Sequence, residues 1–201
     1  MMKTMTTIGA AVCFAASGVS AQELTTNGDF ETGDTSGWVE FPTANSTFNI
    51  TSDSSEGDWA AEIFNNDAAS AAVVKQANIG IGTVNPGDML TISFSAKGSF
   101  ANGGVSFAEF FSEVDGGGTS SNEILGGGPL PLTDTYEDFS FNVIAGSDVT
   151  GGVTLQFTAT TGGDPGSTAV VFIDDVSVVP EPASLGLLGL SGLALLRRRS
   201  A

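Results

Sequence analysis

The stretch LTISFSA (residues 90–96) alternates apolar and polar side chains over its whole length. A period of two places the apolar residues on one side of an extended strand, which is typical of a strand that covers a core with one face. The stretches FSFNV (139–143) and VTLQFTA (153–159) repeat this pattern. Between residues 22 and 179 the sequence does not show the sustained 3.6-residue apolar period of an amphipathic helix. These observations predict an all-β fold.

Six further short strands are expected between segments rich in Gly, Ser, Thr, Asn and Asp. They lie near residues 36–41, 46–51, 59–64, 71–79, 104–113 and 168–178. Nine short strands separated by turns indicate a two-sheet β-sandwich. The glycine runs 116–118 and 126–128 bracket a loop that we expect to be mobile.

The first 21 residues have the features of a secretory signal peptide. Lys3 precedes an apolar run over residues 8–19, and small residues end the segment at Ala21, where we expect the cut. We expect this segment to be helical. A lipoprotein anchor at Cys13 is the weaker alternative, because Cys13 follows Val12 rather than a small residue. Removal of Cys13, the only cysteine, leaves a mature chain with no disulfide.

The C-terminus, from Pro180 onward, combines three features. Pro180-Glu181-Pro182 is followed by an apolar run of 14 residues (183–196) and then by Arg197, Arg198 and Arg199. As a helix the run would reach about 21 Å, against a hydrocarbon core of about 30 Å. It is therefore marginal as a permanent span, although a single-pass tail anchor is an alternative. The arginines would keep this end in the cytoplasm while the body is exported.

These three parts, in this order, resemble the PEP-CTERM sorting signal of Gram-negative bacteria. The resemblance covers residues 180–201 only. It implies that exosortase, a membrane-embedded processing enzyme, recognises Pro180, Glu181 and Pro182 and processes the tail during export. We therefore expect a short helical tail that is in the membrane only transiently, and a protein that reaches the cell surface or the extracellular space.

Residues 22–179 form 158 residues, which is the size of one domain, and contain 22 acidic side chains against Lys75 and Lys97. A net charge of −20 disfavours binding to nucleic acid or anionic lipid and favours divalent cations or neutral partners. Solubility alone would also explain an acidic surface. The whole chain contains no histidine, so histidine-dependent nucleophile systems and the usual zinc and copper sites are excluded.

One carboxylate in the last predicted strand raises a question of charge. Strict alternation would put Asp174 on the same face as Val170, Phe172, Val176 and Val178, and a bare carboxylate buried there would cost several kcal/mol. With so few cationic side chains, a metal ion is the favoured partner, and an all-oxygen site suits calcium. Asn27, Asp29 and Glu31 of the opening segment could lie beside this strand. The alternative is that Asp174 accepts backbone N–H bonds at a half-exposed strand end.

The motif Asn27-Gly-Asp-Phe-Glu31, the pair Gly37-Trp38, the stretch GDWAAEI (57–63) and the closing Ile-Asp-Asp-Val (173–176) resemble carbohydrate-binding modules of the galactose-binding-like jelly-roll group. The resemblance spans residues 24–178. It implies a jelly-roll β-sandwich in which structural calcium ties the opening segment to the last strand. Asn27, Glu31 and Asp174 match the ligand positions, with Asp175 as the alternative to Asp174.

Such modules hold glycans with aromatic rings and flanking polar side chains. Trp59, Phe107 and Phe110 are the candidate ring contacts, although packing of the phenylalanines in the core is an alternative. We expect a non-catalytic, exported domain that binds a polysaccharide or belongs to an exopolysaccharide matrix. A structural or adhesive surface protein without a sugar site is the second hypothesis. A carboxylate-dependent enzyme acting on glycans is the third and least favoured.

Overall fold

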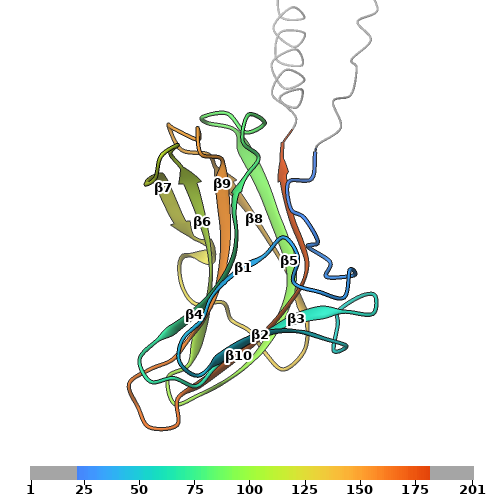
Figure 1. Cartoon of the computed structure of the whole chain (residues 1–201), viewed down its shortest axis with the longest axis vertical. Helices are drawn as coiled ribbons and strands as arrows, with labels where there is room; N and C mark the ends of the chain where they lie inside the picture. Colours follow the sequence, from blue (N-terminus) through green and yellow to red (C-terminus); the bar gives the residue numbers. More distant parts are fainter. Residues whose placement is uncertain (1–21, 182–201) are drawn as a thin grey trace, which may run out of the picture. The chain divides into compact units, whose positions relative to one another are not determined.

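The computed structural model describes residues 22–181, which fold into two five-stranded antiparallel sheets (Figure 1). In sheet A the strand order is β1 (Val39–Phe41), β4 (Ala71–Ile79), β9 (Val153–Thr160), β6 (Val105–Glu113) and β7 (Thr119–Ile124). In sheet B the order is β2 (Ser46–Thr51), β3 (Ala60–Asn65), β10 (Thr168–Pro180), β5 (Met89–Ala101) and β8 (Glu137–Ile144). The predicted all-β sandwich is confirmed, and its topology is jelly-roll-like.

Helix within the described residues is limited to one 3₁₀ turn, Leu125–Gly127. No helix in residues 22–181 is long and apolar enough to cross a bilayer. The predicted helical signal peptide and the predicted helical tail from Pro182 onward lie outside the described residues.

The core lies between the sheets and is built from the alternating apolar positions that the sequence predicts. Leu90, Ile92 and Phe94 of β5 face Leu155 and Phe157 of β9, and all five side chains are buried. The rings of Phe94 and Phe157 meet edge to face with centroids 4.9 Å apart, a preferred geometry for aromatic pairs. Burial of these side chains is the main stabilisation of the sandwich.

The opening segment completes the core before the first strand. Phe30 and Trp38 are buried and stack with centroids 5.4 Å apart. The backbone of this segment lies along β10, because Leu24 N donates to Val178 O and Val176 N donates to Gly28 O, both at 2.9 Å. A Cβ at Gly28 would lie 1.9 Å from Val176 O, so only glycine allows this approach. The expected pairing of the opening segment with the last strand is confirmed.

Two expectations about the strands are wrong. Part of the segment between the glycine runs is not a loop but the edge strand β7, which pairs with β6. In addition, β10 does not stop at residue 178: it continues to Pro180, which pairs with Leu90 of β5. Pro180 is therefore part of the sandwich rather than the start of a linker.

Candidate functional site

Asp174 lies on the outer face of sheet B, not on the core face. The register between β10 and β5 shifts after Asp174, because Asp174 pairs with Ser95 whereas Ser177 pairs with Ser93. The extra residue forms a β-bulge in which Asp175 takes a φ of 49°. Ala169, Val171 and Ile173 face the core before the bulge, whereas Val176 and Val178 face it afterwards; the side chains of these five residues are buried. The alternation argument for Asp174 is thus wrong, because the bulge reverses the parity of the strand.

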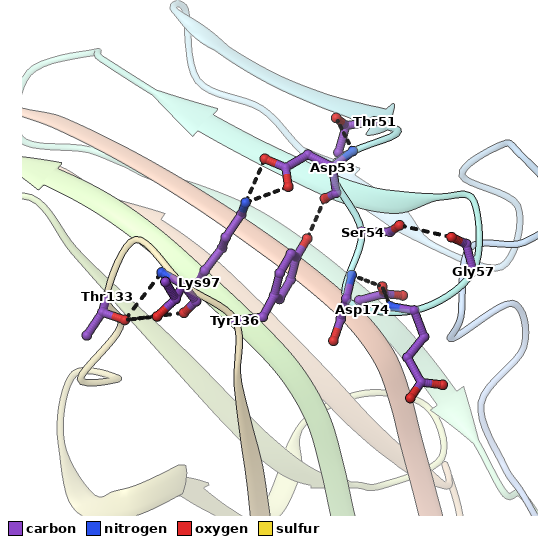
Figure 2. Close-up of polar contacts among 11 residues, drawn as sticks. Thr51, Asp53, Ser54, Gly57, Lys97, Thr133, Tyr136 and Asp174 are labelled. Atoms are coloured by element: carbon purple, nitrogen blue, oxygen red, sulfur yellow. Dashed lines mark hydrogen bonds and ion pairs between the residues drawn. The ribbon is translucent and has the colours of Figure 1, made fainter.

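The Asp174 carboxylate is nevertheless buried, with 1% of its surface exposed. The loop between β2 and β3 (residues 52–59) covers it, and Figure 2 shows Asp174 beneath this loop. Oδ2 accepts hydrogen bonds from Ser55 N at 2.8 Å and Glu56 N at 3.3 Å, and Oδ1 accepts one from Asp175 N at 2.9 Å. Burial raises the pKa of Asp174, while these backbone N–H groups oppose the shift. The partners of this carboxylate are backbone amides.

Glu31 holds the other end of the same loop. Its Oε1 accepts hydrogen bonds from Asp58 N and Trp59 N, each at 2.9 Å. A Cβ at Gly57 would lie 2.2 Å from that oxygen, so the loop approaches the carboxylate closely at a glycine. Asp174 therefore holds residues 55–56 of the loop, and Glu31 holds residues 58–59.

The other two predicted calcium ligands, Asn27 and Asp175, do not contact the β2–β3 loop through the hydrogen bonds that Glu31 and Asp174 make. The Asn27 amide closes its own loop: Nδ2 donates to Asp34 O at 2.9 Å, and Oδ1 accepts from Thr32 N at 3.4 Å. Asp175 faces several carboxylates. Burial raises its pKa, and the charges of Glu56, Asp29, Asp138 and Glu31 raise it further.

The four predicted ligands make hydrogen bonds or face carboxylates in this arrangement. Within residues 22–181 no group of three or more His, Cys, Asp or Glu side chains is placed to hold a metal ion. Asn27, Glu31 and Asp174 each use side-chain oxygens to accept backbone N–H groups. Calcium stays a prediction from sequence, and the hydrogen bonds explain the burial of Asp174 without it.

A second polar cluster lies beside Asp174 on the outer face of sheet B (Figure 2). Lys97 Nζ lies 2.6 Å from Asp53 Oδ1 and 4.8 Å from the ring centroids of both Tyr136 and Phe172. The Tyr136 hydroxyl donates to Asp53 O at 2.6 Å. Burial raises the pKa of Tyr136, and the charges of Asp174, Asp53 and Asp175 add to this. Because Lys97 occupies the faces of both rings, this cluster ties the β2–β3 loop to the segment before β8 and leaves these ring faces less available to a ligand.

The structure separates the three predicted ring contacts. Phe110 is 1% exposed in the core, so its selection as a surface contact is wrong: the inward face of β6 carries Ala108 and Phe110. Trp59 is 39% exposed and lies against Gly33. Phe107 lies on the outward face of β6. Phe111, which was not among the predicted contacts, shares that face. The alternation of side chains along the strand from Phe107 could have indicated it.

The outward positions of sheet A form a continuous row of paired side chains. The register across the five strands joins Val39, Lys75, Gln156, Glu109 and Ile124. Gln156 Nε2 donates to Glu109 Oε2 at 2.8 Å in the centre of this row. Five strands at about 4.8 Å spacing make the face about 19 Å wide. We call this surface the outer face of sheet A.

Aromatic rings flank the central Gln156 and Glu109 pair on both sides along the strands. Phe41 and Phe107 belong to the neighbouring row, which runs through Val73 and Thr158. Phe111 lies on the opposite side, four residues and about 13 Å along β6 from Phe107. Phe41 is 49% exposed, and Lys75 Nζ lies 4.9 Å from its ring centroid.

Two threonines at the centre of the outer face are buried. Thr154 and Thr158 of β9 point outward, yet only 1% and 4% of their surfaces are exposed. The longer side chains of the neighbouring strands β6 and β4 therefore shield them. A cavity of about 450 Å³ adjoins this face at one end, lined by Lys75, Ala77, Asn78, Glu113 and Asp115 among others. The arrangement offers rings at the sides and hydrogen-bonding groups between them.

Comparison with known proteins identifies the C-terminal motif and shows which solved structures share the fold. A model of the PEP-CTERM protein-sorting motif matches residues 178–200. Of the motif residues, Pro180 and Glu181 are described, whereas Pro182, Arg197, Arg198 and Arg199 lie outside the described residues. No curated protein sequence matches the chain significantly.

Solved structures similar to the chain include two carbohydrate-binding modules. The CBM22-1 xylan-binding domain of Xyn10C from Paenibacillus barcinonensis has a TM-score of 0.55 and 13% identity, over 77% of this chain and 92% of that domain. TmCBM61, solved in complex with β-1,4-galactotriose, has a TM-score of 0.50 and 16% identity, over 80% of this chain and 99% of the module.

An enzyme is also among the similar structures. The enzymatically active domain of tailspike protein 4 from bacteriophage CBA120 has a TM-score of 0.61 and 16% identity over 79% of this chain. The match spans only 21% of that tailspike chain. At these identities the likeness concerns the fold. The described part of the chain thus has the jelly-roll-like fold of carbohydrate-binding modules. The chain carries, in addition, a PEP-CTERM sorting motif.

Proposed function

We propose that this protein is an exported, non-catalytic carbohydrate-binding domain that holds a polysaccharide on the outer face of sheet A. The observation that carries the proposal is the arrangement of Phe107 and Phe111 on either side of the hydrogen-bonded Gln156 and Glu109. Rings that cover the apolar faces of sugars, with polar side chains that bind hydroxyl groups between them, are what glycan recognition requires.

The charge of the domain favours a neutral glycan. With a net charge of −20 over residues 22–179, a polyanion would be repelled at long range. The sorting motif supports delivery by exosortase to the cell surface or the extracellular space, where an exopolysaccharide matrix would supply the ligand. The absence of histidine from the sequence supports a binding role over catalysis.

Affinity-gel electrophoresis of residues 22–181 with soluble neutral polysaccharides tests the proposal. If each ring covers about 50 Å² of apolar sugar surface, it contributes about 1.2 kcal/mol, or nearly tenfold in affinity. We expect the Phe107→Ala and Phe111→Ala variants each to lose most of the retardation. The control is Phe64→Ala, which removes a half-buried ring from the outer face of sheet B.

If the Phe107→Ala, Phe111→Ala and Phe64→Ala variants are all retarded equally, the binding site does not lie on the outer face of sheet A. No retardation by any polysaccharide would favour the second candidate, a structural or adhesive surface protein. That candidate is favoured by one observation: the rings on the outer face of sheet A are all phenylalanines, which lack the polar atom that Trp and Tyr offer to sugars.

A further inference from the structure

The first residues of the sorting motif are held inside the folded sandwich. The motif match begins at residue 178, whereas β10 continues to Pro180. Val179 pairs with Thr91 of β5 and Pro180 pairs with Leu90, and beyond the strand Glu181 N donates to Met89 O at 2.8 Å. The residues that a processing enzyme would read therefore overlap with the end of a strand in sheet B.

The strand end is held along its β5 edge and, at Val178, on the other edge as well. On one edge lies β5, with the pairs just described. On the other edge lies the opening segment, where Leu24 N donates to Val178 O at 2.9 Å and Glu23 Oε1 accepts from Val178 N at 3.0 Å. Figure 1 shows the opening segment, β10 and β5 together at this end of the sandwich. An enzyme that binds an extended peptide through its backbone would find the β5 edge of residues 179–181 already paired, and both edges of Val178 occupied.

The glutamate of the motif is also restrained through its side chain. The Thr91 hydroxyl donates to Glu181 Oε1 at 2.6 Å and lies 3.1 Å from Asn142 Oδ1. A hydrogen bond to a carboxylate is shorter and stronger than one between neutral groups. Glu181 is thus bound through its amide by Met89 and through its carboxylate by Thr91.

We propose that the folded sandwich withholds the sorting motif, and that Thr91 and Met89 are positioning residues that set how fast the motif becomes available. Processing then requires the end of β10 to separate from β5 and from residues 23–24. This inference rests on the proposed processing of the motif by exosortase. It adds that residues outside the motif, 90 or more positions before Glu181 in sequence, control that reaction.

The test is a pulse–chase experiment on the full chain in a host that carries the processing enzyme, with intact mass as the readout. Thr91→Val removes the hydroxyl and keeps the shape and β-propensity of the side chain. Loss of this hydrogen bond should increase the open population, and with it the processing rate, about 2- to 10-fold. Thr91→Ser keeps the hydroxyl and should be processed at the wild-type rate. Thr47→Val, at an exposed position of β2, controls for the added apolar group.

Hydrogen exchange on the purified full chain supplies a readout that does not depend on the enzyme. The amide of Glu181 should exchange faster in Thr91→Val by a similar factor. Equal exchange and equal processing in Thr91→Val and wild type would overturn the inference. A wild-type chain that is not processed at all, while Thr91→Val still exchanges faster, would contradict the sorting proposal and leave the restraint in place.

Discussion

Replacement of Asp174 by alanine tests how the sandwich stabilises a buried carboxylate. The change removes the acceptor of Ser55 N, Glu56 N and Asp175 N beneath the β2–β3 loop. Hydrogen bonds to a charged acceptor contribute about 1.5–3 kcal/mol each, so the two bonds to the loop amount to about 3–6 kcal/mol. The cost of burying the charge, which is also the cause of the raised pKa of Asp174, offsets part of this.

We therefore expect Asp174→Ala to lower the free energy of unfolding by about 2–4 kcal/mol. For a domain of this size the melting temperature should fall by about 4–16 °C. Asp174→Asn offers one acceptor oxygen instead of two and should cost about half as much.

Urea unfolding at pH 7, followed by tryptophan fluorescence, measures these differences. Trp38 reports on the core, and Trp59 reports on the β2–β3 loop. A loss below about 1 kcal/mol in Asp174→Ala would refute the reasoning, because the loop would then be held by other contacts.

Two further predictions concern the charges near the bulge. Asp175→Asn should raise the free energy of unfolding at pH 7 by a few tenths of a kcal/mol, because it removes repulsion from Glu56, Asp29, Asp138 and Glu31 that solvent screens at this partly exposed group. The pKa of Asp175 is raised in the folded state, so the protonated side chain stabilises the fold below about pH 4 and this stabilisation is lost as the pH rises. In thermal melts, the stability gained by the Asn variant should therefore grow from pH 4 to pH 7. A gain that does not depend on pH would contradict the repulsion. For calcium, a melting temperature that does not change in chelator would remove the ion predicted from sequence and leave the hydrogen bonds to Asp174 as the full account of its burial. The sequence prediction is a fall that calcium restores and equimolar magnesium does not.

Alternation of apolar residues was sufficient to predict most of the sandwich, because its inward faces obey a period of two. It did not predict β7, whose residues Thr119–Ile124 are mostly polar on both faces. β7 forms because it pairs with β6, and this pairing is not visible in the pattern of its own residues. A polar edge strand lacks the apolar alternation from which the other strands were predicted, so one sequence alone does not reveal it.

The site was harder to predict than the fold, for two physical reasons. A single residue in a left-handed conformation, Asp175, reversed the parity of β10, and no local sequence signal marked the bulge. On β6, alternation separated Phe107 and Phe111 from Phe110, but it did not tell which of the two faces pointed inward. That choice depends on the packing of Phe110 against the opposite sheet.

The most direct test of the proposed glycan site is a nuclear magnetic resonance titration of isotope-labelled residues 22–181 with an oligosaccharide of the polysaccharide that retards it. We expect amide shift changes concentrated on β6, β9 and β4, around Phe107, Phe111 and Gln156. Changes confined to sheet B or to the loop that carries Trp59 would contradict a binding site on the outer face of sheet A.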